Sequence, residues 1–377
     1  MINYGKQFID GEDIKSVIKV LKSNYLTQGP KINEFENHLK KKFGSRHCLT
    51  VSSGTAALFM VSKALGWGKG DTIITSPITF LASANCIVNS GAKPDFVDID
   101  EHSFNINVNK LENKLKKNKK IKAIIAVDYA GHPCDWKSLR YLANKYKIKL
   151  INDNCHALGA KYFNDIQYAI KYADIVTHSY HPVKTITTGE GGAILCNDRK
   201  LHNDLFKMRS HSMVKKKDNK KLWYYEINEA GFNFRITDIQ CALGSSQLKK
   251  LDMFIKKRRK IASYYNKKLK DEVKIVTPKE KNNINHAYHL YPIQVDFKNT
   301  KITKENLFKK MRNLGINLQV HYIPIHLQPF YKKKFKFKRG DFKIAENFYE
   351  REISLPIYPS LTLHEMNKVI RNLRKLI

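Results

Sequence analysis

Apolar and polar positions form two kinds of blocks in the first 250 residues of the chain. Short apolar runs of strand length alternate with longer stretches in which apolar residues recur at helical spacing. The strand-like runs are CLTVSS (48–53), TIITSP (72–77), KPDFVDI (93–99), KAIIAVDY (122–129), KIKLIND (147–153), IVTHSY (175–180) and GAILCN (192–197). This order is typical of βα units around a mainly parallel sheet.

Three of the intervening helices carry recognisable start or stop signals. AALFMVSKALG (56–66) follows Ser-Gly-Thr, FLASANCIVNSG (80–91) ends at a glycine, and DWKSLRYLANKYK (135–147) begins with an aspartate. Serine and aspartate are favoured N-caps, and glycine is the commonest residue just beyond a helix C-terminus. We therefore expect helices over these three ranges.

After Thr237 the pattern changes. A long helical stretch over 238–269 leads into a segment with different alternation. Its strand-like parts are HLYPIQVDF (289–297) and INLQVHYIPI (316–325), and its helical parts are ENLFKKMRNLG (305–315) and LHEMNKVIRNLRKL (363–376). The pattern predicts an α/β fold with a large domain over residues 1–250 and a smaller C-terminal α/β domain over 251–377. Within the C-terminal segment, the Lys- and Phe-rich stretch YKKKFKFKRG (331–340) is expected to be a solvated loop.

Composition narrows the class of protein further. Hydrophobic residues make up 42% of the 377 and charged residues 27%, which is ordinary for a globular protein. The six cysteines lack paired spacing, so we expect neither a metal site nor a disulfide framework. The N-terminus lacks the features of a signal peptide, and no apolar run reaches the roughly 20 residues that span a bilayer. We expect a cytoplasmic protein that does not enter a membrane.

The formal net charge of +34 raises the question of a polyanionic partner. The basic runs are dispersed along the chain, at residues 116–122, 215–221, 256–260 and 332–339. No recognised nucleic-acid-binding motif accompanies them. We therefore interpret them as solvated faces and expect no nucleic-acid partner, with a non-catalytic DNA-binding regulator as the alternative that would use this charge.

The first candidate for chemistry is VSSGTAAL, in which an apolar strand feeds the turn Ser53-Gly54-Thr55 and a helix opens at Ala56. Backbone amides at a helix N-terminus favour a phosphate through hydrogen bonds and the helix dipole. An ordinary capped helix start has the same sequence. These residues alone leave both interpretations open.

The second candidate is INDNCHALGA, where Asp153 ends a strand-like run and His156 follows it. Open parallel sheets bind ligands at the carboxyl ends of their strands. Asp153 could equally form a turn, and His156 could be a satisfied core residue.

The third candidate is Lys184 in HSYHPVKTITTGEGGAILCND, which also follows a strand-like run. A lysine that forms a Schiff base needs a confined site, where desolvation lowers its pKa and leaves the amine neutral. Pro182 and the glycines at 189, 191 and 192 would provide such confinement. In a chain with so many lysines, a solvated surface role is the alternative.

Together the three candidates indicate pyridoxal phosphate. This cofactor requires a lysine, a carboxylate that keeps its ring nitrogen protonated, and donors for its phosphate. Lys184, Asp153 and the Ser53–Ala56 turn could supply one requirement each. No metal is needed for this chemistry.

Long motifs in the same order make the chain resemble a known family, the DegT/DnrJ/EryC1 sugar aminotransferases. The motifs are SSGTAAL, SPITFLASAN, VDYAGHPCDW, NDNCHALGA, SYHPVKTITTGEGGA, GFNFRITDIQCALG and QVHYIPIHLQPFY. The resemblance covers nearly the whole chain. It implies a type I, aspartate-aminotransferase-like fold of pyridoxal-phosphate enzymes, and a homodimer with active sites between the subunits.

The resemblance also implies roles for individual residues. Lys184 would bond covalently to the cofactor, Asp153 would pair with the ring nitrogen, and Phe80 would stack on the ring. The remaining cofactor contacts would be His156, Ser179, Gly54, Thr55, Ala56 and, from the partner chain, Asn233. The nucleotide-sugar contacts would be Tyr4, Asn24, Tyr25, Leu26, Thr27, His321 and Tyr322, with Ser179 and Asn233 shared.

Three further stretches bear on the substrate: LTQGP (26–30), RSHSM (209–213) and AENFYEREISLP (345–356). They resemble family members that transfer an amino group from L-glutamate to C4 of a UDP-linked 4-keto-6-deoxy-N-acetylhexosamine in pseudaminic acid synthesis. Sister aminotransferases for perosamine, 4-amino-arabinose or bacillosamine-type sugars share the general motifs. The sequence therefore leaves the identity of the ketosugar open.

Three positions bear on how closely the chain follows the family pattern. Asn152 and Asn154 flank Asp153 where members often carry an acid or a small residue, which predicts less negative charge around the ring nitrogen's partner. Some relatives that dehydrate sugars carry histidine in place of the lysine. This chain has Lys184 there, which favours transamination.

Overall fold

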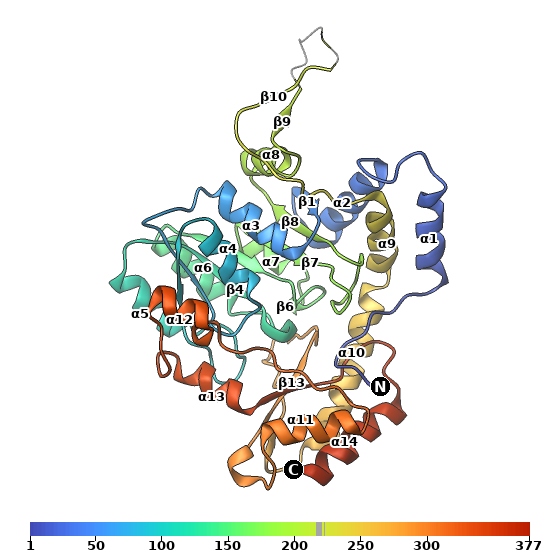
Figure 1. The fold of residues 1–377 in the computed structure, drawn as a ribbon, viewed down its shortest axis with the longest axis vertical. Helices are drawn as coiled ribbons and strands as arrows, with labels where there is room; N and C mark the ends of the chain where they lie inside the picture. Colours follow the sequence, from blue (N-terminus) through green and yellow to red (C-terminus); the bar gives the residue numbers. More distant parts are fainter. Residues whose placement is uncertain (216–220, 222) are drawn as a thin grey trace.

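A seven-stranded sheet forms the centre of the larger part of the molecule (Figure 1). The computed structural model describes residues 1–215, 221 and 223–377, so most of the basic run 215–221 lies outside the described residues. The strand order is β1 (His47–Val51), β8 (Gly192–Cys196), β7 (Ile175–Ser179), β5 (Lys149–Asp153), β4 (Ile121–Val127), β2 (Thr72–Thr75) and β3 (Lys93–Phe96). All seven predicted strands are thus confirmed; β8 runs antiparallel to both of its neighbours, β1 and β7, and the other adjacent pairs in this sheet are parallel.

Helices cover both faces of this sheet, which is why its strands are apolar almost throughout. Successive residues of a strand face opposite sides: Ile124 belongs to one buried apolar cluster, and Ala123 and Ile125 belong to the other. One face carries α3 (Gly54–Ala64), α4 (Ala82–Asn89) and α8 (Arg199–Met208). The other carries α2 (Pro30–Phe43), α5 (Val108–Lys117), α6 (Trp136–Lys145), α7 (Tyr168–Tyr172) and α9 (Asp238–Lys249), with α1 (Gly11–Leu21) packed on α9.

The expected helix signals are present. The Ser53 hydroxyl accepts a hydrogen bond from the Ala56 amide at the start of α3, and the Asp135 carboxylate accepts one from Ser138 at the start of α6. Gly91, with φ of +92°, follows the end of α4. The single helical pattern over 238–269 forms two helices, α9 and α10 (Leu251–Leu269), because the helix is interrupted at Lys250.

The C-terminal part contains a three-stranded antiparallel sheet of β11 (Ile275–Val276), β13 (Tyr291–Val295) and β14 (Glu352–Leu355). It packs with α10, α11 (Lys304–Asn313) and α14 (Leu363–Leu376) around a separate apolar core that also includes Ile2. Two short strand pairs lie elsewhere, β6 (Lys161–Tyr162) with β12 (Ile284–Asn285) and β9 (Met213–Val214) with β10 (Glu226–Ile227). The division at residue 250 stays a prediction.

Two expectations for the C-terminal part are wrong. INLQVHYIPI (316–325) is not a strand: it makes only isolated bridges, Ile316 with Ile2 and Gln319 with Ser354, and because these bridges go to two different segments, neither extends into a ladder. The first half of YKKKFKFKRG is not a loop but part of α12 (Pro329–Phe335), since Tyr331 is buried and packs against Phe96.

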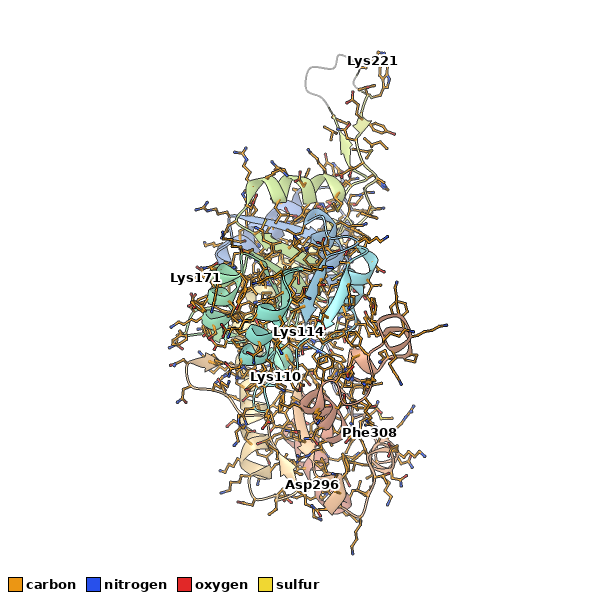
Figure 2. The ribbon with its side chains drawn as sticks, turned by 90° about the vertical axis from the view of Figure 1, so that its left-hand side faces the viewer. Lys110, Lys114, Lys171, Lys221, Asp296 and Phe308 are labelled. Carbon is orange, nitrogen blue, oxygen red and sulfur yellow. The ribbon has the colours of Figure 1, made fainter. Side chains whose placement is uncertain are left out.

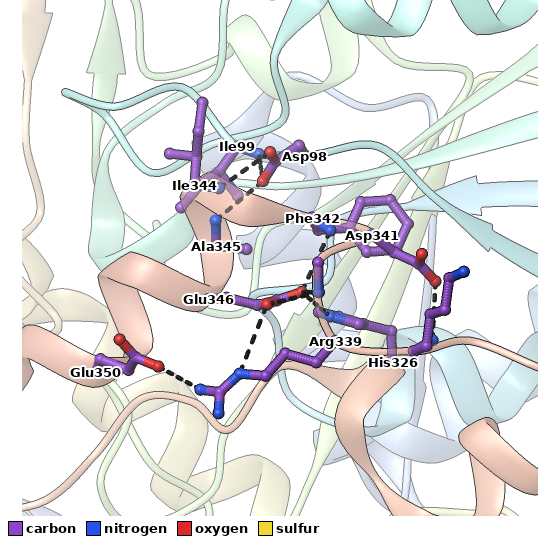
Figure 3. A network of polar contacts seen from close by, with 12 residues as sticks. Asp98, Ile99, His326, Arg339, Asp341, Phe342, Ile344, Ala345, Glu346 and Glu350 are labelled. Carbon is purple, nitrogen blue, oxygen red and sulfur yellow. Dashed lines mark hydrogen bonds and ion pairs between the residues drawn. The ribbon is translucent and has the colours of Figure 1, made fainter.

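The segment from η3 (Ile325–Leu327) to α13 (Lys343–Arg351) fastens the C-terminal part to the large sheet (Figure 3). Asp98 accepts hydrogen bonds from the amides of Ile344 and Ala345 at 3.2 and 2.9 Å, at the start of α13. The buried Glu346 carboxylate accepts from the Gly340 amide and from His326 Nε2, both at 2.9 Å.

Replacing Glu346 with alanine should therefore lower the free energy of unfolding by about 2–4 kcal/mol, because buried donors would lose their acceptor. Urea denaturation checks this. Glu350→Ala is the matched control: Glu350 pairs with Arg339 at the exposed surface, and its loss should change stability by less than about 1 kcal/mol. Equal effects of the two substitutions would contradict the role given to Glu346.

Candidate active site

A cavity of about 780 Å³ lies where the carboxyl ends of β5 and β7 meet the start of α3. Asp153 is the last residue of β5, Ser179 is the last of β7, and Lys184 follows five residues later. All three line the cavity. Two residues from distant parts of the chain, Tyr4 and Tyr322, contribute to its wall.

One end of the cavity suits a phosphate. Gly54 and Thr55 line it at the N-terminus of α3, and within the described residues no acceptor is bonded to their amides. A Cβ at Gly54 would lie 2.8 Å from Ser179 Cβ, so only glycine allows this close approach. Ala56 is buried one residue further on, and its amide bonds Ser53. The two open amides and the Ser179 hydroxyl could hold an anion at the helix dipole.

The Asp153 carboxylate is held by its neighbours. Ser83 Oγ donates to Asp153 Oδ2 at 2.6 Å, and the Cys155 amide donates to Asp153 Oδ1 at 3.2 Å. Thr79 Oγ1 lies 2.9 Å from Ser83 Oγ. Ser83 was not predicted, because residues 80–91 were interpreted only as a helix; a serine on the helix face toward the sheet is the signal that could have indicated it.

Asn152 and Asn154 form hydrogen bonds with a different carboxylate, that of Asp128. Because strand residues alternate, their side chains point away from Asp153, and both amide nitrogens donate to Asp128 Oδ2, at 3.2 and 2.9 Å. Asp128 also accepts hydrogen bonds from the Cys134 amide and the Trp136 indole. Burial raises the pKa of Asp128 to about 6. The two asparagines therefore do not set the charge around Asp153.

Lys184 is suited to act as a neutral amine. Its side chain is half-buried and faces the cavity. Burial lowers the pKa of Lys184 from its ordinary value, although the nearby Asp153 carboxylate acts in the opposite direction. In the described part of the chain, no carboxylate forms an ion pair with it. The amine is thus available to a ligand.

His156 and Tyr322 form a hydrogen-bonded pair in the cavity wall. The Ala130 amide donates to His156 Nδ1 at 3.4 Å, so the proton of the neutral ring is on Nε2, which lies 3.1 Å from the Tyr322 hydroxyl. Burial lowers the pKa of His156 well below its usual range and raises the pKa of Tyr322 well above its own. Tyr322 accepts from His156 and keeps its own proton free to donate.

His321 has a fixed orientation that depends on two residues which the sequence analysis missed. Ser354 Oγ donates to Glu352 Oε1 at 2.6 Å, and His321 Nδ1 lies 2.9 Å from Ser354 Oγ. His321 Nδ1–H therefore donates to Ser354, and Nε2 is left as an acceptor. Burial lowers the pKa of His321 to about 3. No local sequence motif predicts this arrangement, because Glu352 and Ser354 lie on β14, which is distant from His321 in the sequence.

The remaining predicted residues divide into two groups. Phe80 lines the cavity with 52% of its surface exposed, so its ring is available to a ligand. Asn233 and the segment 24–27 do not line it; they are exposed at the surface near the start of α9. The two lie on neighbouring segments, since Thr27 bridges Thr237 and Leu26 O accepts from the Asp238 amide at 3.0 Å.

The cavity therefore offers an anion cradle, a buried carboxylate, an exposed aromatic ring and an amine of lowered pKa, the set that pyridoxal phosphate requires. The sequence profile of the DegT/DnrJ/EryC1/StrS aminotransferase family matches residues 7–374. The chain belongs to this family. A DegT/DnrJ/EryC1/StrS aminotransferase is an enzyme, which sets aside the alternative of a non-catalytic DNA-binding regulator.

Similar proteins cover nearly the whole chain. The UDP-4-amino-4,6-dideoxy-N-acetyl-beta-L-altrosamine transaminase of Campylobacter jejuni is 40% identical over 97% of this chain and 94% of its own length. GDP-perosamine synthase of Escherichia coli O157:H7 is 33% identical over 94% of this chain and 92% of its own. This DegT/DnrJ/EryC1/StrS protein is thus a sugar aminotransferase.

Solved structures agree in fold and cofactor. PseC of Helicobacter pylori, an aminotransferase involved in the biosynthesis of pseudoaminic acid, superposes with a TM-score of 0.92 at 35% identity, covering 100% of this chain and 98% of its own. The putative sugar aminotransferase Spr1654 of Streptococcus pneumoniae, in its PLP form, gives a TM-score of 0.91 at 26% identity, covering 99% and 97%. The type I fold is confirmed, and the cofactor is pyridoxal phosphate.

No helix in the ranges that the structure describes is both long and apolar enough to cross a bilayer.

Proposed function

We propose that the enzyme transfers the amino group of L-glutamate to C4 of UDP-2-acetamido-2,6-dideoxy-β-L-arabino-hex-4-ulose, in pseudaminic acid synthesis. The observation that carries the proposal is the 40% identity, over 97% of the chain, with a transaminase named for the corresponding amino sugar. A sister reaction on a GDP-linked 4-keto sugar is the second candidate, favoured by the 33% identity with GDP-perosamine synthase.

The cofactor supplies the electron chemistry: when bound, it bonds covalently to an amine and takes up the electron pair released at the adjacent carbon. Lys184 would hold the cofactor between reactions. Its neutral Nζ would remove the proton from Cα of glutamate and would later deliver a proton to C4 of the sugar. Delivery from one fixed side determines the configuration of the new amine.

The other residues bind and orient. Asp153, fixed by Ser83, would keep the ring nitrogen protonated, and Phe80 would pack against the ring. Gly54, Thr55 and Ser179, which line the cavity, would hold the phosphate. Tyr322 donates a hydrogen bond into the cavity, and His321 Nε2 accepts one, so a sugar hydroxyl has a donor and an acceptor to bind.

We further propose a homodimer, in which Asn233 and residues 24–27 of one copy complete the cavity of the other. The proposal is supported by their exposure and by their position outside the cavity of their own chain. Tyr25 and Leu26 expose 56% and 47% of their surfaces, and burying these apolar side chains would favour association.

The substrate test is product analysis with [15N]L-glutamate and each of the two ketosugars. We expect NMR to show 15N at C4 of the UDP-linked sugar, at a rate at least about tenfold above that of the GDP-linked sugar, because the contacts to the base and sugar in the transition state differ. Faster labelling of the GDP-linked sugar would replace the first candidate with the second.

A further inference from the structure

Three hydrogen-bonding side chains form a row that leads from the wall of the active-site cavity to β14. His321 lines the cavity, and its Nδ1 lies 2.9 Å from Ser354 Oγ. Ser354 Oγ in turn lies 2.6 Å from Glu352 Oε1. All three residues are buried. The row therefore connects a group that a substrate can reach with a carboxyl group that it cannot reach, since Glu352 does not line the cavity.

The position of His321 is fixed by its main chain as well. Its backbone amide donates to Glu352 Oε2 at 3.0 Å, and its carbonyl oxygen accepts a hydrogen bond from the Tyr129 hydroxyl. The ring of Tyr4 packs on the imidazole, with 5.2 Å between the ring centroids. The ring thus keeps Nδ1 on Ser354, and Nε2 is the nitrogen left for a ligand.

The hydrogen bonds of this row can run in either direction. With Glu352 ionised, Ser354 donates to Glu352, His321 Nδ1–H donates to Ser354, and Nε2 is an acceptor. With Glu352 protonated, Glu352 donates to Ser354, Ser354 donates to Nδ1, and the ring proton is on Nε2. One proton separates the two states: it enters at Nε2, the Nδ1 proton passes to Ser354, and the serine proton passes to Glu352 Oε1. Every buried group keeps a partner in both states, so neither carries the cost of an unsatisfied donor or acceptor.

The surroundings of Glu352 make both states accessible. Burial raises the pKa of Glu352 far above its ordinary value. The hydrogen bonds from Ser354 and His321 and the charge of Lys304 act in the opposite direction without cancelling this effect. Lys304 belongs to α11, the helix of which Phe308 is labelled in the C-terminal part of Figure 2. The carboxyl group can therefore gain or lose its proton at a pH at which an ordinary glutamate is fully ionised.

His321 and two nearby tyrosines keep one charge state during this exchange. Burial lowers the pKa of His321 to about 3, so the ring does not hold two protons. The charge of Glu352 also acts on Tyr322 and on Tyr129 of η1 (Tyr129–Gly131), and burial raises the pKa of both phenols well above their usual range. An added proton is therefore passed along the row to Glu352.

The two substrates of the enzyme need opposite partners. A carboxylate of L-glutamate only accepts hydrogen bonds, whereas a hydroxyl of the ketosugar can donate one. We propose that Glu352, acting through Ser354, decides whether His321 offers an acceptor to the ketosugar or a donor to a carboxylate of L-glutamate. The inference rests on the proposed function and deepens it. Glu352 and Ser354 are positioning residues that adapt one side chain to two substrates, which occupy the cavity in turn.

The first test determines the tautomer of His321 in the holoenzyme without substrate. With 15N-labelled histidine, long-range 1H–15N NMR shows which ring nitrogen carries the proton, and the signal that is missing in His321→Gln identifies the residue. We expect the proton to move from Nε2 to Nδ1 as the pH rises through the pKa of Glu352. In Glu352→Gln the proton should stay on Nε2 at every pH, because the amide NH2 donates to Ser354 where a carboxylate accepts.

Two further variants make this result specific. Ser354→Ala interrupts the row but leaves the carboxyl group in place, so the tautomer of His321 should no longer follow the pH. Glu346→Gln is the matched control, because Glu346 is also buried but bonds His326 and does not line the cavity. In this control His321 should titrate as in the wild type. Thermal unfolding of each variant checks that the fold is intact.

Steady-state kinetics measure the consequence for the substrates. In Glu352→Gln the KM of the ketosugar should rise about tenfold, because the sugar hydroxyl loses its acceptor, while the KM of L-glutamate should not rise. In the wild type the KM of the ketosugar should fall as the pH rises through the pKa of Glu352. This pH dependence should be absent from Glu352→Gln.

The outcomes separate this inference from the proposed function. The same tautomer of His321 in the wild type and in Glu352→Gln at every pH would overturn the inference. A change of tautomer that leaves the KM of the ketosugar unchanged would overturn it as well. Neither result would affect the proposed function, which fails instead if the wild type transfers no 15N from L-glutamate to the UDP-linked ketosugar.

Discussion

Replacing Lys184 with alanine is expected to reduce the rate of transamination by at least about 10³-fold, because the same side chain bonds to the cofactor and carries the proton. No other lysine lines the cavity among the described residues, so none can take over. The visible absorbance of a lysine-bound cofactor should disappear as well. Steady-state kinetics and the absorption spectrum of the purified variant check both expectations.

Two controls make the Lys184 result specific. Lys184→Arg keeps a positive charge but offers no amine of lowered pKa, so it should be as inactive as the alanine variant. A small primary amine such as ethylamine, added to Lys184→Ala, should restore part of the proton transfer by occupying the vacated space. Transamination by Lys184→Ala at the wild-type rate would show that another group is the nucleophile.

The sequence predicted those parts of the site that depend on local structure. Asp153, Ser179 and Lys184 follow apolar runs, and parallel strands bring their carboxyl ends to one edge, so the three residues line one cavity. The Ser53–Ala56 turn could be placed for the same reason, because the cap and the glycine are adjacent in sequence.

Long-range packing could not be derived from the residues alone. Ser83 reaches Asp153 across 70 positions, and Glu352 and Ser354 orient His321 from another strand. Periodicity reports which face of an element is apolar, but it does not report which polar residue on a distant element meets it. INLQVHYIPI (316–325) is an example. Its apolar and polar residues alternate as in a strand, yet it forms only isolated bridges, one to Ile2 and one to Ser354.

For Asn152, Asp153 and Asn154, by contrast, the alternation of side chains along an extended chain is enough to predict which side chains point the same way. Asn152 lies on the opposite face of β5 from Asp153, the last residue of the strand, and Asn154, the next residue, points to the same side as Asn152. The amide groups of Asn152 and Asn154 therefore stabilise the buried Asp128 carboxylate. That the chain has asparagine at these two positions does not change the charge near the ring nitrogen. The two acids at the ends of β4 and β5 thus have distinct environments, and they can be separated by experiment.

Asp153→Asn is expected to lower kcat by about 10²–10³-fold, because the amide has nearly the same shape but no negative charge to keep the ring nitrogen protonated. Stopped-flow absorbance of the reaction with L-glutamate measures the loss in the first half of the reaction. Ser83→Ala should lower kcat by about tenfold at most, since it removes the 2.6 Å hydrogen bond that orients Asp153 but leaves the carboxylate in place.

Asp128→Asn is the contrasting substitution. Asp128 does not line the cavity, and its carboxylate serves Trp136, Cys134 and the two asparagines. Losing these charge-assisted bonds should lower the free energy of unfolding by about 1–3 kcal/mol and leave the cofactor spectrum unchanged. If Asp128→Asn lowered kcat as much as Asp153→Asn does, the assignment of Asp153 as the partner of the ring nitrogen would be contradicted. The reaction would then depend on the combined negative charge of both carboxylates and not on that of Asp153 alone.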